Sequence, residues 1–101
     1  MKVINGFAEL LKVYDSLPNS GWIFIDHDFD TSSKSDLLNR DYYLSENDDE
    51  EFEMEEDKST FLESPIFKDI VINKLKHNQQ ASKDEMLDAA IYYLENDDFL
   101  D

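Results

Sequence analysis

The strongest constraint in the sequence is an acidic run from Glu46 to Asp57, in which nine of twelve residues are Asp or Glu. Carboxylates this close together repel one another, so the run has to lie at the surface and the core must come from the flanking segments. Phe52 and Met54 interrupt the run at alternate positions. This spacing is typical of a loop held at two points or of a short strand, and it predicts a weak strand over 51–54.

The rest of the composition allows one modest hydrophobic core. Hydrophobic residues make up 41% of the chain, including seven Phe and five Tyr. A length of 101 residues is typical of one domain, so we expect residues 1–101 to fold as a single unit. With only two Gly and two Pro, the chain lacks the turn residues that a β-sandwich or barrel needs.

Three segments, 3–15, 64–77 and 82–96, have the apolar periodicity of amphipathic helices. Ser64 can cap free N–H groups at the start of the second segment, and Pro65 is tolerated in a first helical turn. The third segment opens with a Ser-x-x-Glu capping box. We therefore predict three helices.

Two further segments are predicted to be strands. Residues 21–26 contain Trp, Ile, Phe and Ile in succession, and aromatic and β-branched residues favour a strand in so short a run. Residues 41–45 give the second strand, and residues 28–39 are expected to form a loop. The predicted fold class is therefore α+β, with about three helices packed on a small two- or three-stranded sheet.

The charge balance limits the kinds of partner. Twenty-five Asp and Glu against nine Lys and Arg give a formal net charge of −16. Nucleic acids and anionic membranes repel such a surface, so we expect neither as a direct partner and expect a basic protein instead. The same repulsion favours a monomer before binding.

The sequence favours a cytoplasmic location. There are no cysteines, whereas small secreted domains are often stapled by disulfides. Glu9 and Lys12 interrupt the region where a signal peptide would need an apolar core. The longest apolar run, 22–25, is far shorter than a membrane span.

Catalytic motifs are mostly missing, and we expect no enzyme activity, metal or cofactor. The sharpest candidate is Asp26-His27-Asp28-Phe29-Asp30, whose alternating carboxylates resemble the start of a calcium loop. Thr31 stands where that loop needs Gly, and Leu37 stands where it needs Glu. A histidine that follows a strand in a polar loop is usually not catalytic, so His27 is not assigned a role.

The acidic run and the tyrosines before it form the predicted interface. Tyrosines beside carboxylates provide flat contact area with hydrogen-bonding tips, and we expect Tyr42, Tyr43 and Phe52 to be the anchors. The alternative is that the run is only a solvated loop. The predicted partner-binding residues are Asp41, Tyr42, Tyr43, Glu46, Asp48, Asp49, Glu50, Glu51, Phe52, Glu53, Glu55, Glu56 and Asp57.

The end of the chain places Phe99 and Leu100 among four acids. We expect these two apolar residues to dock back on the core as a C-terminal clip. A second acidic patch used in binding is the alternative.

Several stretches resemble a known group of proteins. Lys68-Asp69-Ile70-Val71, the linker 78–80, the segment 92–99 and the opening 11–18 are similar to a family of small acidic bacterial domains. Such domains resemble the immunity proteins encoded beside bacterial toxins, including those of contact-dependent growth inhibition systems. The resemblance covers about half the chain and implies a cytosolic inhibitor of a cognate toxin.

Three functions remain as hypotheses. The first is an immunity protein that neutralises a basic toxin of the nuclease type by covering its active site. The second is a nucleic-acid mimic that inhibits a DNA- or RNA-binding enzyme. The third is an adaptor domain without a toxin. Clustering of the carboxylates beside aromatic residues favours the first, since a mimic should space its charges like the phosphates of a duplex.

Overall fold

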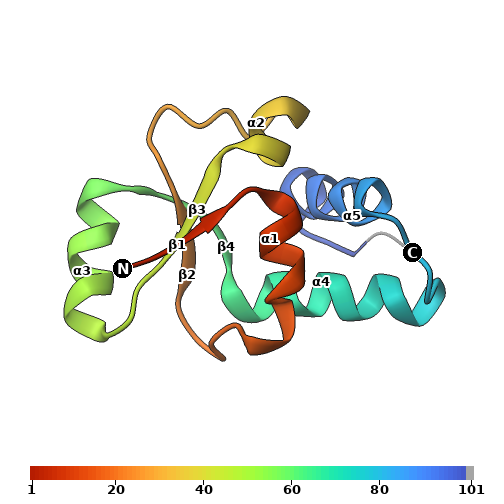
Figure 1. Cartoon of the computed structure of the whole chain (residues 1–101), viewed down its shortest axis with the longest axis horizontal. Coiled ribbons are helices and arrows are strands. Elements are labelled where there is room, and N and C mark those ends of the chain that lie inside the picture. Colours follow the sequence, from red (N-terminus) through yellow and green to blue (C-terminus); the bar gives the residue numbers. More distant parts are fainter. Residues whose placement is uncertain (100–101) are drawn as a thin grey trace.

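The computed structural model describes residues 1–99, and its centre is a four-stranded sheet with helices on both faces (Figure 1). All neighbouring strands are antiparallel, in the order β1-β3-β2-β4. The α+β class is confirmed, although the sheet has four strands rather than two or three. The strands are β1 (Lys2–Asn5), β2 (Trp22–Ile25), β3 (Asp41–Leu44) and β4 (Ser59–Glu63).

The helices of residues 1–99 differ widely in length. Two are long and amphipathic, and they match the predicted helices 64–77 and 82–96 to within one residue. The helices are α1 (Phe7–Lys12), the short 3-10 helix η1 (Tyr14–Ser16), α2 (Lys34–Asn39), α3 (Asp48–Asp57), α4 (Ser64–His77) and α5 (Lys83–Asn96).

The main core lies on the face of the sheet that α1, α4 and α5 cover (Figure 1). Successive strand residues point to opposite faces, so Ile23 and Ile25 of β2 join this core. The rings of Phe7 in α1 and Phe67 in α4 meet edge to face, with centroids 6.0 Å apart. Both rings are fully buried, so this contact joins α1 to α4 within the core.

The opposite face of the sheet is covered by α3, which lies away from the other long helices (Figure 1). Phe24 in β2 is fully buried and Met54 in α3 is 5% exposed, yet neither belongs to the main core. In the register of the sheet, Tyr43 pairs with Val3 on one side and with Phe24 on the other. These three residues therefore form a row across the face that α3 partly covers.

Two predicted elements at the N-terminal half are wrong. The segment 3–15, predicted to be one helix, contains the end of β1, the six-residue helix α1 and most of the 3-10 helix η1. Gly6, between β1 and α1, has φ +89°, which interrupts a continuous helix at this position. The loop predicted over 28–39 contains α2. Ser33 caps the start of this helix, because its hydroxyl accepts a hydrogen bond of 3.2 Å from the Asp36 N–H.

The segment 51–54 is also not a strand, because it lies inside α3. The strand that completes the sheet is β4, which directly precedes α4 and was not predicted.

Phe99 docks beside Tyr93 of α5, with ring centroids 5.4 Å apart, as expected for that half of the C-terminal clip. Leu100 lies outside the described residues. Within residues 1–99, no helix has the length and hydrophobicity needed to span a bilayer.

Candidate interaction surface on α3

Helix α3 carries eight acidic residues among its ten positions. Its start is capped, because the Asn47 side chain accepts a hydrogen bond of 2.8 Å from the Glu50 N–H. Acids in the first turn are favourable there, since the helix dipole places partial positive charge at the N-terminus. The last turn contains Glu55, Glu56 and Asp57 with no basic residue, and at this end the dipole makes them unfavourable.

The inner side of α3 is attached to the sheet through polar contacts as well as through Met54. Glu51 Oε1 accepts a hydrogen bond of 3.0 Å from the backbone N–H of Trp22. This carboxylate occupies the space beside Gly21, where an added Cβ would lie 2.5 Å from Glu51 Oε1. Gly21 has φ +89°, a conformation that favours glycine, so the approach of α3 to β2 depends on this residue.

A second set of contacts joins the end of α3 to the sheet. Lys58, which follows the helix, donates to Asp26 Oδ1 at 2.8 Å and lies 4.2 Å from the centre of the Tyr43 ring. Arg40 and the Tyr43 hydroxyl donate to Asp26 Oδ2 at 3.3 and 3.1 Å. The ammonium of Lys58, the first residue after α3, is thus hydrogen-bonded to Asp26 of the sheet side and not to a carboxylate of the helix.

These contacts shift the titration of the groups involved. The hydrogen bond from Lys58 holds the pKa of the Asp26 carboxyl below its usual value, and the same bond raises the pKa of the Lys58 ammonium. Burial and then the hydrogen bond to Asp26 raise the pKa of the Tyr43 hydroxyl. All three groups therefore keep their ordinary neutral-pH forms, as in a structural ion-pair network.

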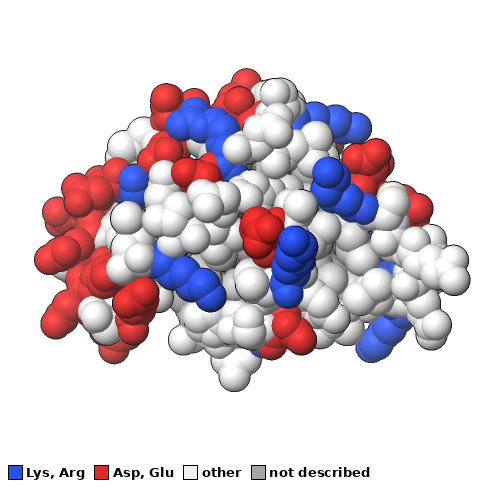
Figure 2. All heavy atoms as spheres, in the orientation of Figure 1, with Lys and Arg blue, Asp and Glu red and all other residues white. Residues whose placement is uncertain are grey.

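The outer side of α3 presents an aromatic ring among carboxylates. Phe52 is 67% exposed, the most exposed large hydrophobic residue in the described chain. Residues three or four positions apart are neighbours on a helix, so Phe52 has Asp48, Asp49, Glu55 and Glu56 around it. These four acids are exposed, and Figure 2 shows Asp and Glu residues, in red, gathered over the α3 end of the molecule.

A shallow hollow of about 170 Å³ lies beside the start of α3. The carboxylates of Glu46, Asp48 and Glu51 are among the residues that line it, and the remaining lining is Pro18, Ser20, Ser45 and Asn47. A space of this size with three carboxylates fits the side chain of a Lys or Arg from a partner.

The predicted anchors have different positions in the structure. Phe52 is exposed, as an anchor has to be. Tyr42 is fully buried, and its hydroxyl donates to the Leu37 carbonyl at 2.6 Å, so it is a core residue and cannot contact a partner. Tyr43 is half-buried below Lys58, and Asp41 is half-buried at the opposite end of β3 from the start of α3. The two tyrosines differ because neighbouring strand residues point to opposite faces.

The acids of the predicted site divide between the two sides of α3. Glu50 and Glu51 are half-buried and take part in contacts with the rest of the chain. The exposed members of the predicted set, which we call the acidic surface, are Glu46, Asp48, Asp49, Phe52, Glu53, Glu55, Glu56 and Asp57.

No motif in the sequence predicts the ion-pair network around Asp26, although Asp26 begins the stretch that resembles the start of a calcium loop. His27 Nδ1 lies 2.8 Å from the Ser59 hydroxyl, and His77 Nδ1 lies 2.9 Å from the Asn73 carbonyl. Neither histidine contacts a carboxylate in these hydrogen bonds. Among residues 1–99, no group of three or more His, Cys, Asp and Glu is arranged to hold a metal ion.

The arrangement defines a small acidic α+β domain with a charged helix on the otherwise open face of its sheet. The chain belongs to the family described as a domain of unknown function (DUF7716), which matches residues 7–101. The match covers every element after β1. No curated protein matches the chain, and no solved structure does.

Proposed function

We propose that the protein binds a basic protein through the acidic surface on α3 and that this partner is a cognate bacterial toxin domain. In this proposal it is an immunity protein that acts in the cytoplasm. The observation that carries the proposal is the exposed Phe52 ring among uncompensated carboxylates. The acids in the last turn of α3 oppose the helix dipole, and a cost in stability of this kind is expected where a surface serves binding.

The mechanism is occlusion of a basic cleft. Toxins that cut nucleic acids need cationic clefts for phosphates, and the carboxylates of α3 can occupy such a cleft. Complementary charge would raise the association rate and disfavour wrong partners, while Phe52 would supply affinity in a desolvated pocket. A nuclease is therefore the toxin class that fits this surface best.

The distribution of charge supports a toxin inhibitor over a nucleic-acid mimic. A mimic needs carboxylates spaced along the molecule like phosphates along a duplex. In this fold six exposed carboxylates, those of Asp48, Asp49, Glu53, Glu55, Glu56 and Asp57, lie on one ten-residue helix. The binding surface we propose is accordingly small and centred on one aromatic residue.

The test uses the toxin domain encoded beside the gene. A variant with Asp48→Asn, Asp49→Asn, Glu55→Gln and Glu56→Gln removes four exposed charges around Phe52. The matched control removes four exposed charges elsewhere, with Asp15→Asn, Asp69→Asn, Asp84→Asn and Glu95→Gln. We expect the first variant to associate more slowly with the toxin, with a weaker salt dependence, and to lose protection of growing cells.

The control should keep the association rate, the salt dependence and the protection of cells, because it has the same net charge as the first variant and differs only in the position of the changes. Equal association rates and equal salt dependence for the two variants would contradict the proposal. So would the lack of any toxin gene beside genes of this family.

A further inference from the structure

Strand β1 forms one edge of the sheet, and among residues 1–99 no strand pairs with its outer side. An edge strand presents unpaired N–H and C=O groups, which an extended segment of another chain can pair with. Val3 in this strand is 45% exposed although it is apolar. The edge is therefore not protected by a charged residue at its centre.

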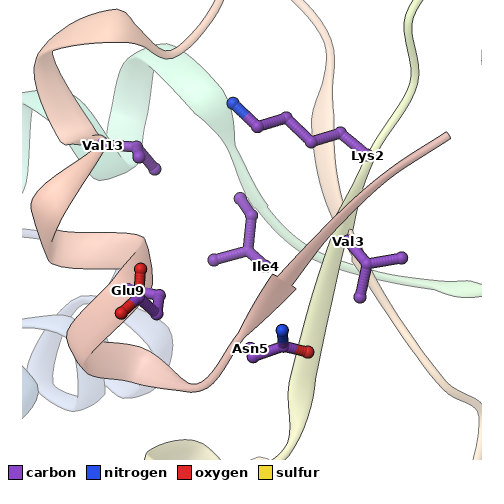
Figure 3. A pocket seen from close by; sticks show the side chains of 6 residues that line it. All are labelled: Lys2, Val3, Ile4, Asn5, Glu9 and Val13. Atoms are coloured by element: carbon purple, nitrogen blue, oxygen red, sulfur yellow. The ribbon is translucent and has the colours of Figure 1, made fainter.

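A hollow of about 310 Å³ lies between β1 and α1, lined by Lys2, Val3, Ile4, Asn5, Glu9 and Val13. Figure 3 shows that Ile4 and Lys2 point toward α1, where Glu9 and Val13 lie, while Val3 points away. An added strand would alternate in the same way, with one set of side chains beside the hollow and the other set beside Val3.

The acidic surface begins next to this edge. The amino group of Met1 lies 2.7 Å from Glu50 Oε1 and 3.9 Å from Glu46 Oε1, so the start of β1 is beside the start of α3. A chain that extended along β1 would therefore have one end close to carboxylates. At the hollow itself the charges are balanced, because Lys2 lines it and Glu9 pairs with Lys12 at 3.2 Å.

We propose that β1 accepts an extended segment of the basic partner as a fifth strand of the sheet, with aliphatic and cationic residues alternating along that segment. This inference rests on the proposed function in that the partner is basic. Backbone hydrogen bonds along β1 supply register and affinity. The aliphatic residues face Ile4 and Val13 at the hollow, and the Lys or Arg residues lie on the Val3 side, where those at the start of β1 are nearest Glu46 and Glu50. A second copy of the chain is a poor occupant because both copies carry a charge of −16.

The probe is a synthetic peptide of four Lys-Val repeats with blocked ends, titrated into the full chain and followed by amide NMR shifts and hydrogen exchange. Two isomers serve as controls, one N-methylated at every lysine and one at every valine. Both keep the charge, but each loses the N–H groups of one edge of the peptide strand. We expect at least one isomer to bind about tenfold more weakly than the parent peptide.

Exchange of the amides in residues 2–5 should slow when the parent peptide is bound. In the chain, Val3→Lys should weaken binding by about tenfold, because it places a cation on the edge facing a cationic strand. Ile72→Lys is the matched control, since Ile72 is 38% exposed on α4, and it should leave binding unchanged.

Equal binding of the parent peptide and both methylated isomers would overturn the strand addition and leave the proposed charge-driven function intact. If none of the three cationic peptides bound, the result would count against both the strand addition and the proposed function. A dimer seen by sedimentation, with slowed exchange in residues 2–5 at high protein concentration, would show that a second copy occupies the edge and would overturn the proposal.

Discussion

The Lys58 ammonium lies 2.8 Å from the Asp26 carboxylate and joins the end of α3 to the end of β2. Both side chains are less than one-third exposed, so solvent screens this ion pair less than a fully exposed one. Arg40 and Tyr43 donate to the same carboxylate. The position of the acidic helix on the sheet therefore depends on a residue outside the helix.

The Asp26→Asn variant should be less stable than the natural chain. It keeps the size of the side chain but loses the charge that Lys58 and Arg40 pair with, and we expect the free energy of unfolding to fall by about 1–2 kcal/mol. Asp28→Asn is the matched control, because Asp28 pairs only with Arg40 in these contacts and its side chain is 79% exposed. Urea unfolding measures the free energy of unfolding of both variants. An equal loss for the two would contradict the conclusion that Asp26 stabilises the fold through Lys58 and Arg40.

The contribution of Asp26 should also depend on pH in a defined direction. Lys58 lowers the pKa of the Asp26 carboxyl below 3.8, so the unfolded state takes up a proton more readily than the folded state. The stability difference between the natural chain and Asp26→Asn is then fully present above the unfolded pKa. It should shrink as the pH falls from about 5 through the folded pKa. A difference that stayed constant from pH 6 to pH 2.5 would contradict this.

Substitutions at the two ends of α3 should have opposite effects on stability. Glu56→Lys places a cation in the last turn, where the dipole favours it, and should raise the free energy of unfolding by about 0.5 kcal/mol. Asp48→Lys makes the same change of charge in the first turn and should lower it by a similar amount. Thermal unfolding at low salt measures both. Equal shifts would mean that net charge alone decides, not the helix dipole.

The Gly21→Ala substitution should separate α3 from the sheet locally. Its Cβ would meet Glu51 Oε1 at 2.5 Å, and φ +89° is unfavourable for alanine, so we expect a loss of about 1–3 kcal/mol. In a Glu51→Ala background the same substitution should cost less, because only the backbone strain remains. Identical costs in the two backgrounds, measured as a double-mutant cycle, would show that the two residues are not coupled.

How far the fold could be predicted depended on whether an element is stabilised locally. Helices α4 and α5 have their own apolar stripes, so the periodicity is sufficient to predict them. Ser82 caps α5 as predicted, but Ser64 does not cap α4, because it lies inside the helix and its hydroxyl makes no capping hydrogen bond. The sequence around α3 instead suggested a strand, because Phe52 and Met54 alternate. In the structure Met54 is buried whereas Phe52 is exposed, and the helix is held by the Asn47 cap, by the hydrogen bond from the Trp22 N–H to Glu51 and by the burial of Met54.

Strand β1 illustrates a second limit. Ile4 fits a helical stripe and a strand equally well, and the choice is made by pairing with β3, which is about forty residues away. The sequence proposes the segment 41–57 as a candidate surface, but it does not show which of these residues face solvent and which face the core. Tyr42 and Tyr43 are equivalent by composition, and only the register of the sheet places one in the core and the other beside Lys58.

Tyr42→Phe and Phe52→Ala should therefore separate folding from binding. Tyr42→Phe removes a buried hydroxyl that donates to the Leu37 carbonyl, and it should lower the free energy of unfolding by about 1–2 kcal/mol without changing affinity for the toxin domain. Phe52→Ala should leave stability within about 0.5 kcal/mol, since the ring is 67% exposed, and should weaken binding by about 2 kcal/mol. Calorimetry of unfolding and of toxin binding measures the four values. If Phe52→Ala bound as tightly as the natural chain, the exposed ring would not be the anchor, and the proposal would have to rest on charge alone.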